Sequence, residues 1–513
     1  DSSRQLNAAF NPDFGQVESD DVVVNFSASE TFYSDKRPFF SENHNLFNVQ
    51  GSRFFYVINT RRIGASPDYN CSEDFPLQQE LCADSQKGAN DIDAAFRYTQ
   101  QGENFDVGFL GAFEANEKFS KGKDFYAVRL RTKKDNLTVG YLGTYVNRPV
   151  INRTAKVNAL DFEYRPSNIR RLSGTALASD VNGEKGYGFN LGYGYDPSKN
   201  RHNGVGVFYV DEDLDMKDMG YLWRNNLLMI SGRASIKQTD FSQDSIARAR
   251  KYAIGYNLKS TSDFEKEPSG FYFLAENSFT NTSEIKAEVF YRTTGRDNLI
   301  TRKSALSPFI NMPKGYGVEL EYSGPSDDFL QYGFEVERSQ GSRYSAALGW
   351  QTSYQGKVSI SPADTLSLSL FYKHGQEEDW LNWLQDNVLG TYQKKQRTTI
   401  AGLQWFKGNK HELRIKAQMV AFTARDPQAY LADLYGNLNP SSNINLSPIT
   451  LSELAFQVRY RYELMPLAYL YVVYTKGGRI VADDTEDDLS ELYKRPWNDP
   501  QSDNFTVKLR YRF

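Results

Sequence analysis

The sequence lacks any long hydrophobic run, and it has few histidines and cysteines for its 513 residues. Because no stretch of about 18 apolar residues occurs, a transmembrane helix is excluded. The four histidines, His44, His202, His374 and His411, are spread along the chain, and no Gly-x-Ser-x-Gly elbow, phosphate-binding loop or Cys-x-x-Cys-His haem motif is present. These absences give catalysis little support, so we expect a protein that is not an enzyme and carries no cofactor.

An excess of positive charge is also missing. Lys and Arg total 60 and Asp and Glu total 64, which gives a net charge of -4. A nucleic-acid-binding protein would show a concentrated basic excess, so that class is excluded. Aromatic residues reach 14% of the chain, whereas disordered chains are poor in aromatics, so we expect a folded protein. No signal peptide opens the chain, and because it begins with Asp1 rather than Met we expect a processed or trimmed product.

The two cysteines, Cys71 and Cys82, lie in a polar segment rich in Gly, Asp and Ser. We predict a disulfide between them, formed in an oxidising compartment, and two unpaired thiols are the alternative. A metal site needs more ligands than this stretch offers, because it holds no histidine.

Apolar and polar residues alternate with a period of two along almost the whole chain. Near the C-terminus, Phe505, Val507, Leu509, Tyr511 and Phe513 share one face, and Thr506, Lys508, Arg510 and Arg512 share the other. The same alternation occupies 187–195, 285–292, 316–322, 366–373 and 453–464. Each segment runs about 9 to 13 residues, the length that a tilted strand needs to cross a bilayer. Strands of a soluble sandwich are usually nearer 5 or 6 residues.

This pattern predicts an all-β fold, a closed antiparallel transmembrane β-barrel in the outer membrane of a Gram-negative bacterium, in contact with the lipid bilayer and lipopolysaccharide. We expect about 22 strands in a barrel domain over 53–513. The run Asp21–Phe32 also alternates, and with a further strand in 33–52 the total would be about 24. The favoured interpretation leaves 1–52, which includes Glu30, Lys36 and Arg37, out of the wall as a plug or a segment at the periplasmic mouth.

Short turns with proline separate several strands, at 164–167, 195–198, 361–364 and 465–466, whereas longer polar links occupy 294–314, 374–387, 424–450 and 478–502. Outer-membrane barrels have short periplasmic turns and long outer loops, so 154–165, 186–195, 341–361, 451–464 and 503–513 should all run towards the periplasm. The segment that holds both cysteines then becomes an outer loop. The last strand closes on Phe513, which resembles the C-terminal signal by which the barrel-assembly machinery recognises its substrates.

Charged residues at inward positions of the strands are the candidate functional groups. The basic ones, near the closing seam, are Arg129, Arg131, Lys133, Arg414, Lys416, Arg459, Arg461, Lys508, Arg510 and Arg512. The acidic ones, on the strands in between, are Asp161, Glu163, Glu288, Glu319, Glu321, Glu335 and Glu337. Two walls of opposite charge would set a transverse field across a polar pore and tune its ion selectivity. The alternative is that these charges pair across neighbouring strands and fill the interior.

Acidic loop residues are a weaker candidate site. Asp211, Asp213 and Asp215 have the Asp-x-Asp-x-Asp spacing that suits calcium, and a second acidic run occupies 483–488. The loop lacks the Gly and the distal Glu of a full calcium-binding loop, so solvated surface charge is the favoured alternative. Trp380 and Trp383 could stack on sugars, although packing at the membrane interface or within a loop is the favoured interpretation.

The first 64 residues contain a set of short motifs. They are Asn11-Pro12-Asp13-Phe14-Gly15-Gln16-Val17-Glu18, Glu30-Thr31-Phe32, Lys36-Arg37-Pro38-Phe39-Phe40 and Arg61-Arg62-Ile63-Gly64. Together they resemble an uncharacterised family of bacterial outer-membrane barrels, and the resemblance extends through the barrel to Phe513. Members of that family usually carry an N-terminal carbohydrate-binding module of the family-nine type, which is absent here. The resemblance implies the barrel fold and keeps a glycan open as a partner, but it implies no reaction.

Three functions remain after these exclusions. The first is a channel, similar to a porin, that passes or gates a polar solute through the charged lumen, with 1–52 as its gate. The second is a scaffold or export conduit that holds a partner lipoprotein or a secreted protein. The third is an outer-membrane enzyme whose active site is built from distant barrel residues.

Overall fold

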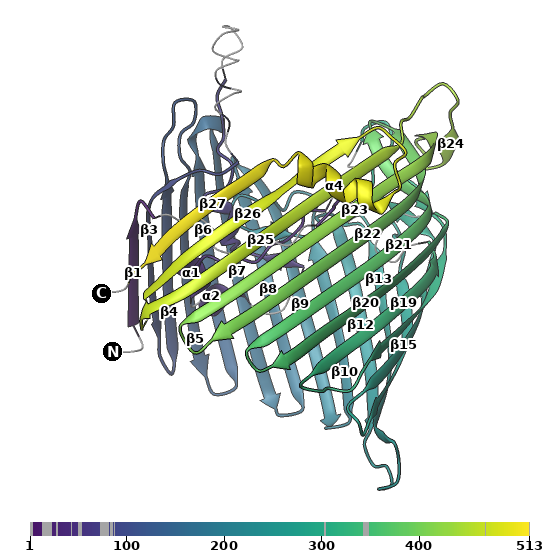
Figure 1. Ribbon diagram of the computed structural model, residues 1–513, viewed down its shortest axis with the longest axis horizontal. Coiled ribbons are helices and arrows are strands. Elements are labelled where there is room, and N and C mark those ends of the chain that lie inside the picture. The colour runs from purple at the N-terminus through teal and green to yellow at the C-terminus, as the bar shows by residue number, and fades with distance from the viewer. Residues whose placement is uncertain are drawn as a thin grey trace. The chain divides into compact units, whose positions relative to one another are not determined.

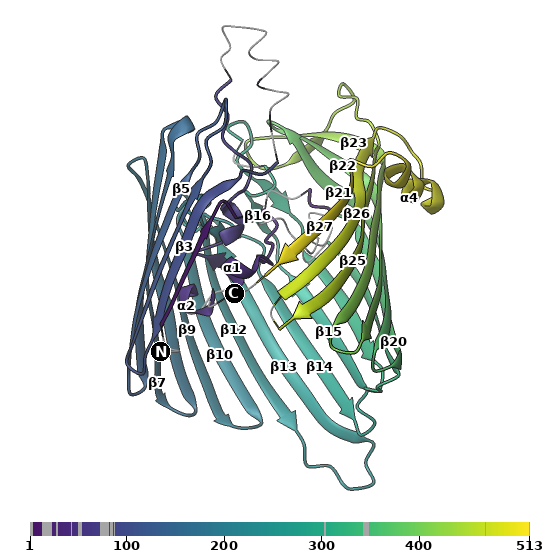
Figure 2. The ribbon, with the colours of Figure 1, turned by 60° about the vertical axis from the view of Figure 1, so that its left-hand side comes forward.

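The computed structural model describes residues 4–12, 23–26, 29–42, 44–49, 54–71, 82, 86, 88–301, 304–341, 348–466 and 468–511. The contacts divide the chain into two units, one of 1–16, 29–233 and 259–265, and one of 17–28, 234–258 and 266–513. Both units are built mainly from long antiparallel strands (Figures 1 and 2). None of the helices among these residues has the length and the apolar content that a membrane span requires.

The first unit begins with one strand, continues through short helices, and then forms a series of hairpins. Its elements are β1 (Arg4–Phe10), α1 (Pro38–Ser41), α2 (His44–Phe47), β2 (Phe55–Tyr56), the 3-10 helix η1 (Thr60–Arg62), β3 (Ile92–Gln101), β4 (Phe105–Glu114), β5 (Asp124–Lys134), β6 (Leu137–Arg148), η2 (Pro149–Ile151), β7 (Arg153–Ser167), β8 (Arg170–Val181), β9 (Glu184–Ser198), β10 (Arg201–Val210) and β11 (Tyr221–Leu222). Each strand from β3 to β10 pairs with the next, and β1 pairs with the free edge of β3. A further strand, β12 (Leu227–Gln238), belongs to the same sheet.

The second unit continues the antiparallel pattern with longer strands. Its elements are β13 (Ala247–Ser260), β14 (Gly270–Phe279), β15 (Glu284–Arg292), β16 (Gly295–Asp297), β17 (Ile310–Met312), β18 (Gly315–Ser323), β19 (Leu330–Gln340), β20 (Trp350–Ala363), β21 (Leu366–Gln385), β22 (Val388–Lys407), β23 (His411–Ala432), β24 (Leu438–Pro440), β25 (Ile449–Met465), β26 (Ala468–Ala482), α4 (Leu489–Asn498) and β27 (Ser502–Arg510). Neighbours pair in the order β13, β14, β15, β18 to β23, β25, β26 and β27.

The two faces of these strands differ in burial as the alternation predicts. Leu130 is 39% exposed while its neighbour Arg129 is 0% exposed, and Val289 is 49% exposed while its neighbour Glu288 is 6% exposed. A sheet in water shows the reverse, with apolar side chains buried and charged ones exposed. We call the face that carries the exposed apolar residues the outer face, and the face that carries the buried charges the inner face.

The strand count agrees with the prediction, but the N-terminal boundary does not. The sheet has 23 strands, and 22 without the three-residue β24, which pairs with the end of β23. One of the 22 is β1, whose ladder with β3 runs from Arg4 opposite Gln100 to Phe10 opposite Ala94. Part of 1–52 therefore belongs to the sheet, because these residues form hydrogen bonds with the edge of β3 that would otherwise be open. The described residues of the run 21–32 lie outside any strand.

The predicted turns and links are confirmed at one end of the strands and corrected at the other. Short turns join β7 to β8, β9 to β10, β20 to β21 and β25 to β26, as predicted. Two of them lie slightly later than expected, at 168–169 and 199–200, because 164–167 and 195–198 are the ends of β7 and β9. In contrast, most of the expected link 374–387 is strand, because β21 and β22 extend over 20 residues each. Closure of the sheet stays a prediction, since no residue-by-residue ladder among the described residues joins β1 to β27.

Candidate functional site

The described residues of 29–63 in the first unit, which are 29–42, 44–49 and 54–63, lie on the inner face of the sheet, and we call them the inner segment. Figure 2 shows its two helices α1 and α2 beside β3. Their apolar side chains share one core with inward residues of β3 to β6: Phe40, Leu46, Phe47, Ala95, Leu110, Ala112, Phe125, Ala127 and Leu142. Several inward positions of these strands are small, and a Cβ atom at Gly108 would lie 2.9 Å from the Phe47 ring. The small residues therefore make room for the helices.

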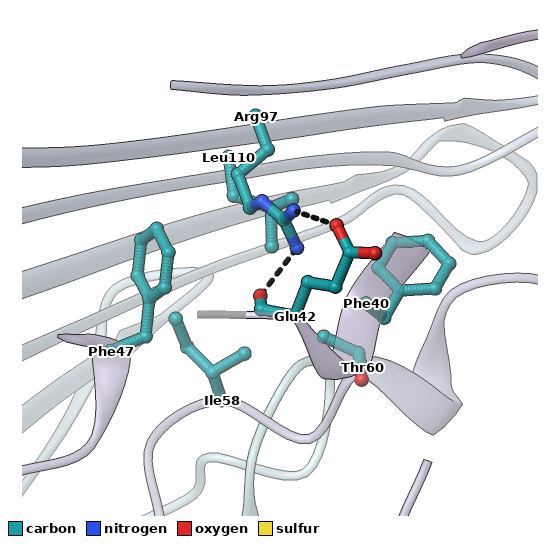
Figure 3. Close-up of a pocket in the computed structure, with 7 residues that line it drawn as sticks. All are labelled: Phe40, Glu42, Phe47, Ile58, Thr60, Arg97 and Leu110. Atoms are coloured by element: carbon teal, nitrogen blue, oxygen red, sulfur yellow. Dashed lines mark hydrogen bonds and ion pairs between the residues drawn. The ribbon is translucent and has the colours of Figure 1, made fainter. Parts of the chain in front are cut away.

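Arg97 of β3 forms hydrogen bonds with the backbone at the end of α1. Its guanidinium donates hydrogen bonds to the carbonyl oxygens of Phe39 and Glu42, the latter at 2.5 Å, and pairs with the Glu42 carboxylate at 3.3 Å. The contact borders a pocket with about 250 Å³ of non-protein space, part of it open to solvent (Figure 3). The side chain of Arg97 is 3% exposed, so its two terminal nitrogens bind the inner segment rather than water.

Arg129 of β5 holds the end of α2 in a similar way. Its guanidinium is fully buried and pairs with Asp161 of β7 through two bonds of 2.5 and 3.0 Å. The same group donates to the carbonyl oxygen of Leu46 at 3.1 Å and to that of Asn48 at 3.4 Å. Carbonyls at the end of a helix carry partial negative charge, and a buried cation satisfies them well. The inner segment thus covers the ion pair of Arg129 and Asp161.

The predicted plug residues have partners within the inner segment. Arg37 pairs with Asp35 at 2.6 Å and donates to the carbonyl oxygens of Thr60 and Ile63 at 2.6 and 2.9 Å. Burial would raise the pKa of Asp35, but the hydrogen bonds and charge of Arg37 outweigh it and hold the pKa below its usual value. Glu30 pairs with Arg62 at 2.6 Å, which ties the start of the segment to its end, and Lys36 is exposed.

Two further N-terminal residues pack on the inner face of the second unit. Val24 and Phe26 lie against a cluster that includes Trp380 and Phe422, with the Phe26 ring 4.7 Å from that of Phe422. Trp380 is only 5% exposed, so it is not a platform for a sugar. Trp383 packs against another apolar cluster and donates to the carbonyl oxygen of Asp386. Both tryptophans thus pack against apolar side chains, as the favoured interpretation expected, but they lie in β21 rather than in a loop.

The basic inward residues of the first unit are paired rather than arranged as a charged wall. Besides the buried pair of Arg129, Arg131 and Lys133 both bind Asp106, at 2.6 and 2.8 Å. Glu163 binds Arg165 and Arg171 at the end of the strands. Pairing across neighbouring strands, which was the alternative to a field, therefore describes this part of the chain.

The second unit separates its inward charges. Three arginines, Arg414, Arg459 and Arg461, converge on Glu412, which is 1% exposed. Lys416 is half-buried, and Lys508 and Arg510 lie on inward positions of β27. The predicted Arg512 and the assembly signal at Phe513 lie outside the described residues.

The acidic inward residues lie on β15, β18 and β19. Lys286 binds Glu319 at 2.9 Å and Glu321 at 3.3 Å, and the Glu335 carboxylate accepts a hydrogen bond from Gln355 at 2.8 Å. Glu288 and Glu337 are buried on the same face. Within the described ranges, Glu319, Glu321 and Glu335 are the three carboxylates close enough together to share a metal ion. The ammonium group of Lys286 already occupies part of that space.

The acidic loop between β10 and β11 makes its own contacts. Asp211 accepts hydrogen bonds from the backbone amides of Tyr187 and Leu214, and Asp215 pairs with Arg153 at 2.8 Å. Asp218 pairs with Arg153 at 2.7 Å, and although burial would raise its pKa, hydrogen bonds from arginine hold the pKa below the usual value. Asp213 is exposed. Calcium binding at this loop stays a prediction.

The disulfide is confirmed, and the most important contacts were not foreseen. Cys71 and Cys82 are bonded, with their Cα atoms 5.7 Å apart. Arg97 and Glu412, the residues that organise the two inner faces, were absent from the predicted set. Both occupy inward positions in the alternating pattern, so the signal that found their neighbours could have found them too.

Comparison with known proteins identifies a family but no activity. Similar solved structures include the ferric enterobactin receptor PfeA (9% identity, 75% of this chain and 80% of that chain, TM-score 0.34) and the siderophore receptor PirA from Acinetobacter baumannii (8%, 82% and 78%, 0.34). A bacterial polysaccharide outer membrane secretin also matches (12%, 65% and 96%, 0.27). At these TM-scores the likenesses assign neither a function nor a ligand. No curated protein matches the chain.

A family model matches nearly all of the sequence. It covers residues 2–123 and 128–513, which includes β1, the inner segment and all of the other strands except the first four residues of β5. That members of this family usually carry a carbohydrate-binding module of the family-nine type stays a prediction. The chain belongs to the family described as a domain of unknown function, DUF5916.

Proposed function

We propose that this protein is an outer-membrane channel that passes or gates a polar solute. In this proposal the sheet is the wall of a membrane pore, its inner face lines the path, and the inner segment restricts that path. No reaction and no cofactor enter the proposal.

The burial pattern supports a membrane location. Large apolar side chains are exposed on many neighbouring strands of the outer face, for example Leu320 at 50%, Val336 at 42% and Val507 at 60%. A contiguous apolar surface over several strands is costly in water and favourable in lipid. The buried charges of the inner face suit a polar interior, since lumen-facing residues of such barrels are polar.

The position of the inner segment in the chain supports a fixed constriction rather than a detachable plug. The segment follows β1 and precedes β3, and these two strands pair with each other. In the chain, the inner segment therefore lies between two strands that pair with each other, and 11–28 and 64–91 connect it to them. With β1 counted and the three-residue β24 left out, the strand number is 22, which is even, as an all-antiparallel closed sheet requires.

The observation that carries the proposal is the pair of buried arginines under the segment. Arg97 and Arg129 belong to strands of the sheet. The guanidinium group of each donates hydrogen bonds to backbone carbonyl oxygens of the inner segment. A cation that loses its partner and stays buried costs several kcal/mol. The segment is thus a specific occupant of the inner face, held at the ends of α1 and α2.

Single-channel conductance in planar bilayers tests the proposal. One variant replaces 29–49 with a Gly/Ser linker and keeps β1, so that the wall stays complete. We expect a conductance several-fold above that of the intact chain. The matched control places the same linker in 239–246, the loop between β12 and β13, and should conduct like the intact chain.

Two results would contradict the proposal. If neither the intact chain nor the 29–49 variant conducts, although both keep the heat-dependent gel mobility of a folded barrel, the channel is wrong. If a lipoprotein or secreted protein copurifies reproducibly in mild detergent, the scaffold or export alternative takes its place.

A further inference from the structure

We infer that the first unit binds oxyanions, which are solutes with phosphate or carboxylate groups, on its inner face at the end of the strands where β5 turns into β6 and β7 turns into β8. The inference rests on the proposed function, because it names the class of solute that the pore would select. The site is a set of six inward side chains, which we call the turn-end cluster: Asp106, Arg131, Lys133, Glu163, Arg165 and Arg171.

Two cations share the first carboxylate of the cluster. The buried side chain of Asp106 binds Arg131 at 2.6 Å and Lys133 at 2.8 Å. It also accepts a hydrogen bond from the backbone amide of Gly102 at 3.2 Å, which fixes its position. A single carboxylate offsets a single positive charge, so this half of the cluster keeps one positive charge in excess.

Two arginines share the second carboxylate. Arg165 donates to one oxygen of Glu163 at 2.7 Å, and Arg171 donates to the other oxygen at 2.6 Å. The side chains of Arg165 and Arg171 are 60% and 48% exposed, whereas that of Glu163 is 16% exposed. Glu163 therefore lies beneath the two guanidinium groups, and their remaining N–H donors stay accessible to a ligand.

The cluster as a whole keeps an excess of positive charge. Among the described residues, its six side chains form ion pairs only with one another, four cations with two carboxylates. The next inward carboxylate along the sheet is Asp196 of β9, which pairs with His202 at 3.1 Å. Even with Asp196 counted, four cations face three carboxylates. An anion is therefore attracted to this end of the inner face.

The inward positions beside Arg171 leave room for a ligand. Gly194 lies opposite Arg171, and Gly192, Gly204 and Gly206 extend the same surface over β9 and β10. A Cβ atom at any of these four glycines would lie no closer than 3.5 Å to its nearest neighbour among the described residues. No side chain rises from these positions, so an anion can approach the guanidinium of Arg171 over bare backbone.

The geometry of the cluster suits oxyanions better than simple halides. A guanidinium presents parallel N–H donors that match two oxygens of a carboxylate or phosphate. Arg165 and Arg171 are already held by Glu163, so they lose little side-chain freedom when a ligand binds. Lys133 and Glu163 occupy one cross-strand row, with Thr138 between them, so the two halves of the cluster lie about 10 Å apart. A solute with two anionic groups can contact both halves.

The cluster lies next to the inner segment. Arg131 is two residues beyond Arg129 on the same face of β5, and Arg129 donates to the carbonyl oxygen of Leu46 in α2 at 3.1 Å. In the proposed channel, a solute would therefore meet the excess positive charge directly beside the constriction. A charge at that place acts on every ion that passes, and so it would set the selectivity of the pore.

Equilibrium binding of pyrophosphate to the purified full-length protein, measured by calorimetry in detergent at low salt, tests the inference. We expect saturable binding to the native chain. In the double variant Arg165→Gln with Arg171→Gln the dissociation constant should rise about tenfold or more, because each protein charge about 6 Å from one ligand charge contributes about threefold in water. The matched control is Arg170→Gln on the same strand. Arg170 lies on the outer face, over the ring of Tyr195, so its loss should leave the dissociation constant unchanged.

A second variant guards against misfolding of the first. Glu163→Gln removes a negative charge from beneath the two arginines, so pyrophosphate should bind about threefold more tightly. A misfolded protein would not gain affinity. Absence of saturable binding to the native chain, or an unchanged dissociation constant in both folded variants, would overturn the inference.

Reversal potentials separate the turn-end cluster from the channel. In a KCl gradient, the double arginine variant should lower the chloride-to-potassium permeability ratio and Glu163→Gln should raise it, both by less at high salt. A protein that conducts but binds no pyrophosphate overturns the cluster as a site and leaves the channel standing. A protein that binds pyrophosphate with the expected effects of the variants but conducts in no form overturns the channel and leaves the site standing.

Discussion

Replacing Arg129 with methionine is the sharpest perturbation of the contact between wall and inner segment. The Arg129 and Asp161 side chains are 0% and 1% exposed, so the substitution leaves a buried carboxylate without its charge partner. Breaking a buried pair in this way costs about 3–5 kcal/mol. Loss of the hydrogen bond to the Leu46 carbonyl adds about 1 kcal/mol. Lifting α2 lets water reach Asp161, so most of this cost favours opening of the segment.

Hydrogen exchange of the α2 amides, measured by mass spectrometry in detergent, reports that opening. A cost of about 4 kcal/mol should speed exchange about a thousandfold, since 1.4 kcal/mol corresponds to a factor of ten. The double variant Arg129→Met with Asp161→Leu removes both charges and should speed exchange only about tenfold, the effect of the lost carbonyl bond.

The matched control is Arg131→Met, one inward position further along β5. Asp106 keeps Lys133 at 2.8 Å in that variant, so α2 should exchange within about threefold of the native rate. The reasoning is refuted if the double variant opens as readily as the single one. That result would mean that the hydrogen bonds to the carbonyls of the segment, and not the buried ion pair of Arg129 and Asp161, keep the segment in place.

Two further predictions concern the same segment. The pKa of Asp35 is lower in the folded protein than in the unfolded chain, so its contact with Arg37 and Thr60 stabilises the segment above about pH 4 and is lost as the pH falls through the folded pKa. Peptic peptides around Arg37 should therefore show a lower protection factor, which is corrected for the intrinsic pH dependence of exchange, at pH 3 than at pH 6 in the native chain, and Asp35→Asn should remove that difference. Gly108→Val would place a side chain where the Phe47 ring lies 2.9 Å from the Cβ position, so overpacking of about 1–3 kcal/mol should displace α2. Protease cleavage within α2 with the sheet intact checks this, and protection equal to that of the native chain would show that the ring moves aside.

The alternation was enough to predict the strands and their two faces. In a strand, successive side chains point to opposite faces, so a local pattern decides which residues share a face without knowledge of their partners. Leu130 against Arg129 and Val289 against Glu288 follow that rule. The disulfide between Cys71 and Cys82 was equally accessible, because two cysteines in a polar loop of a chain with no others have one intramolecular partner.

The strands of the N-terminal region were harder to predict, because the alternation suggested one strand that does not form and failed to indicate one that does. The alternating run 21–32 is not strand in its described part, whereas the less conspicuous Arg4–Phe10 pairs along the edge of β3. A period of two describes any extended chain with one side against a wall, and Val24 and Phe26 pack in that way without a ladder. Only the availability of an unpaired edge separates the two cases, and an edge is a property of the assembled sheet.

The sequence by itself determined that this chain is a long-stranded antiparallel sheet with an apolar outer face, a charged inner face and one disulfide. The tertiary structure decided which inward charges meet one another. Arg129 finds its partners 32 and 83 residues away, in Asp161 and in the carbonyl of Leu46, and Arg459 meets Glu412 47 residues away. Local periodicity places a charge on a face, but its partner depends on the register of distant strands and on what covers them.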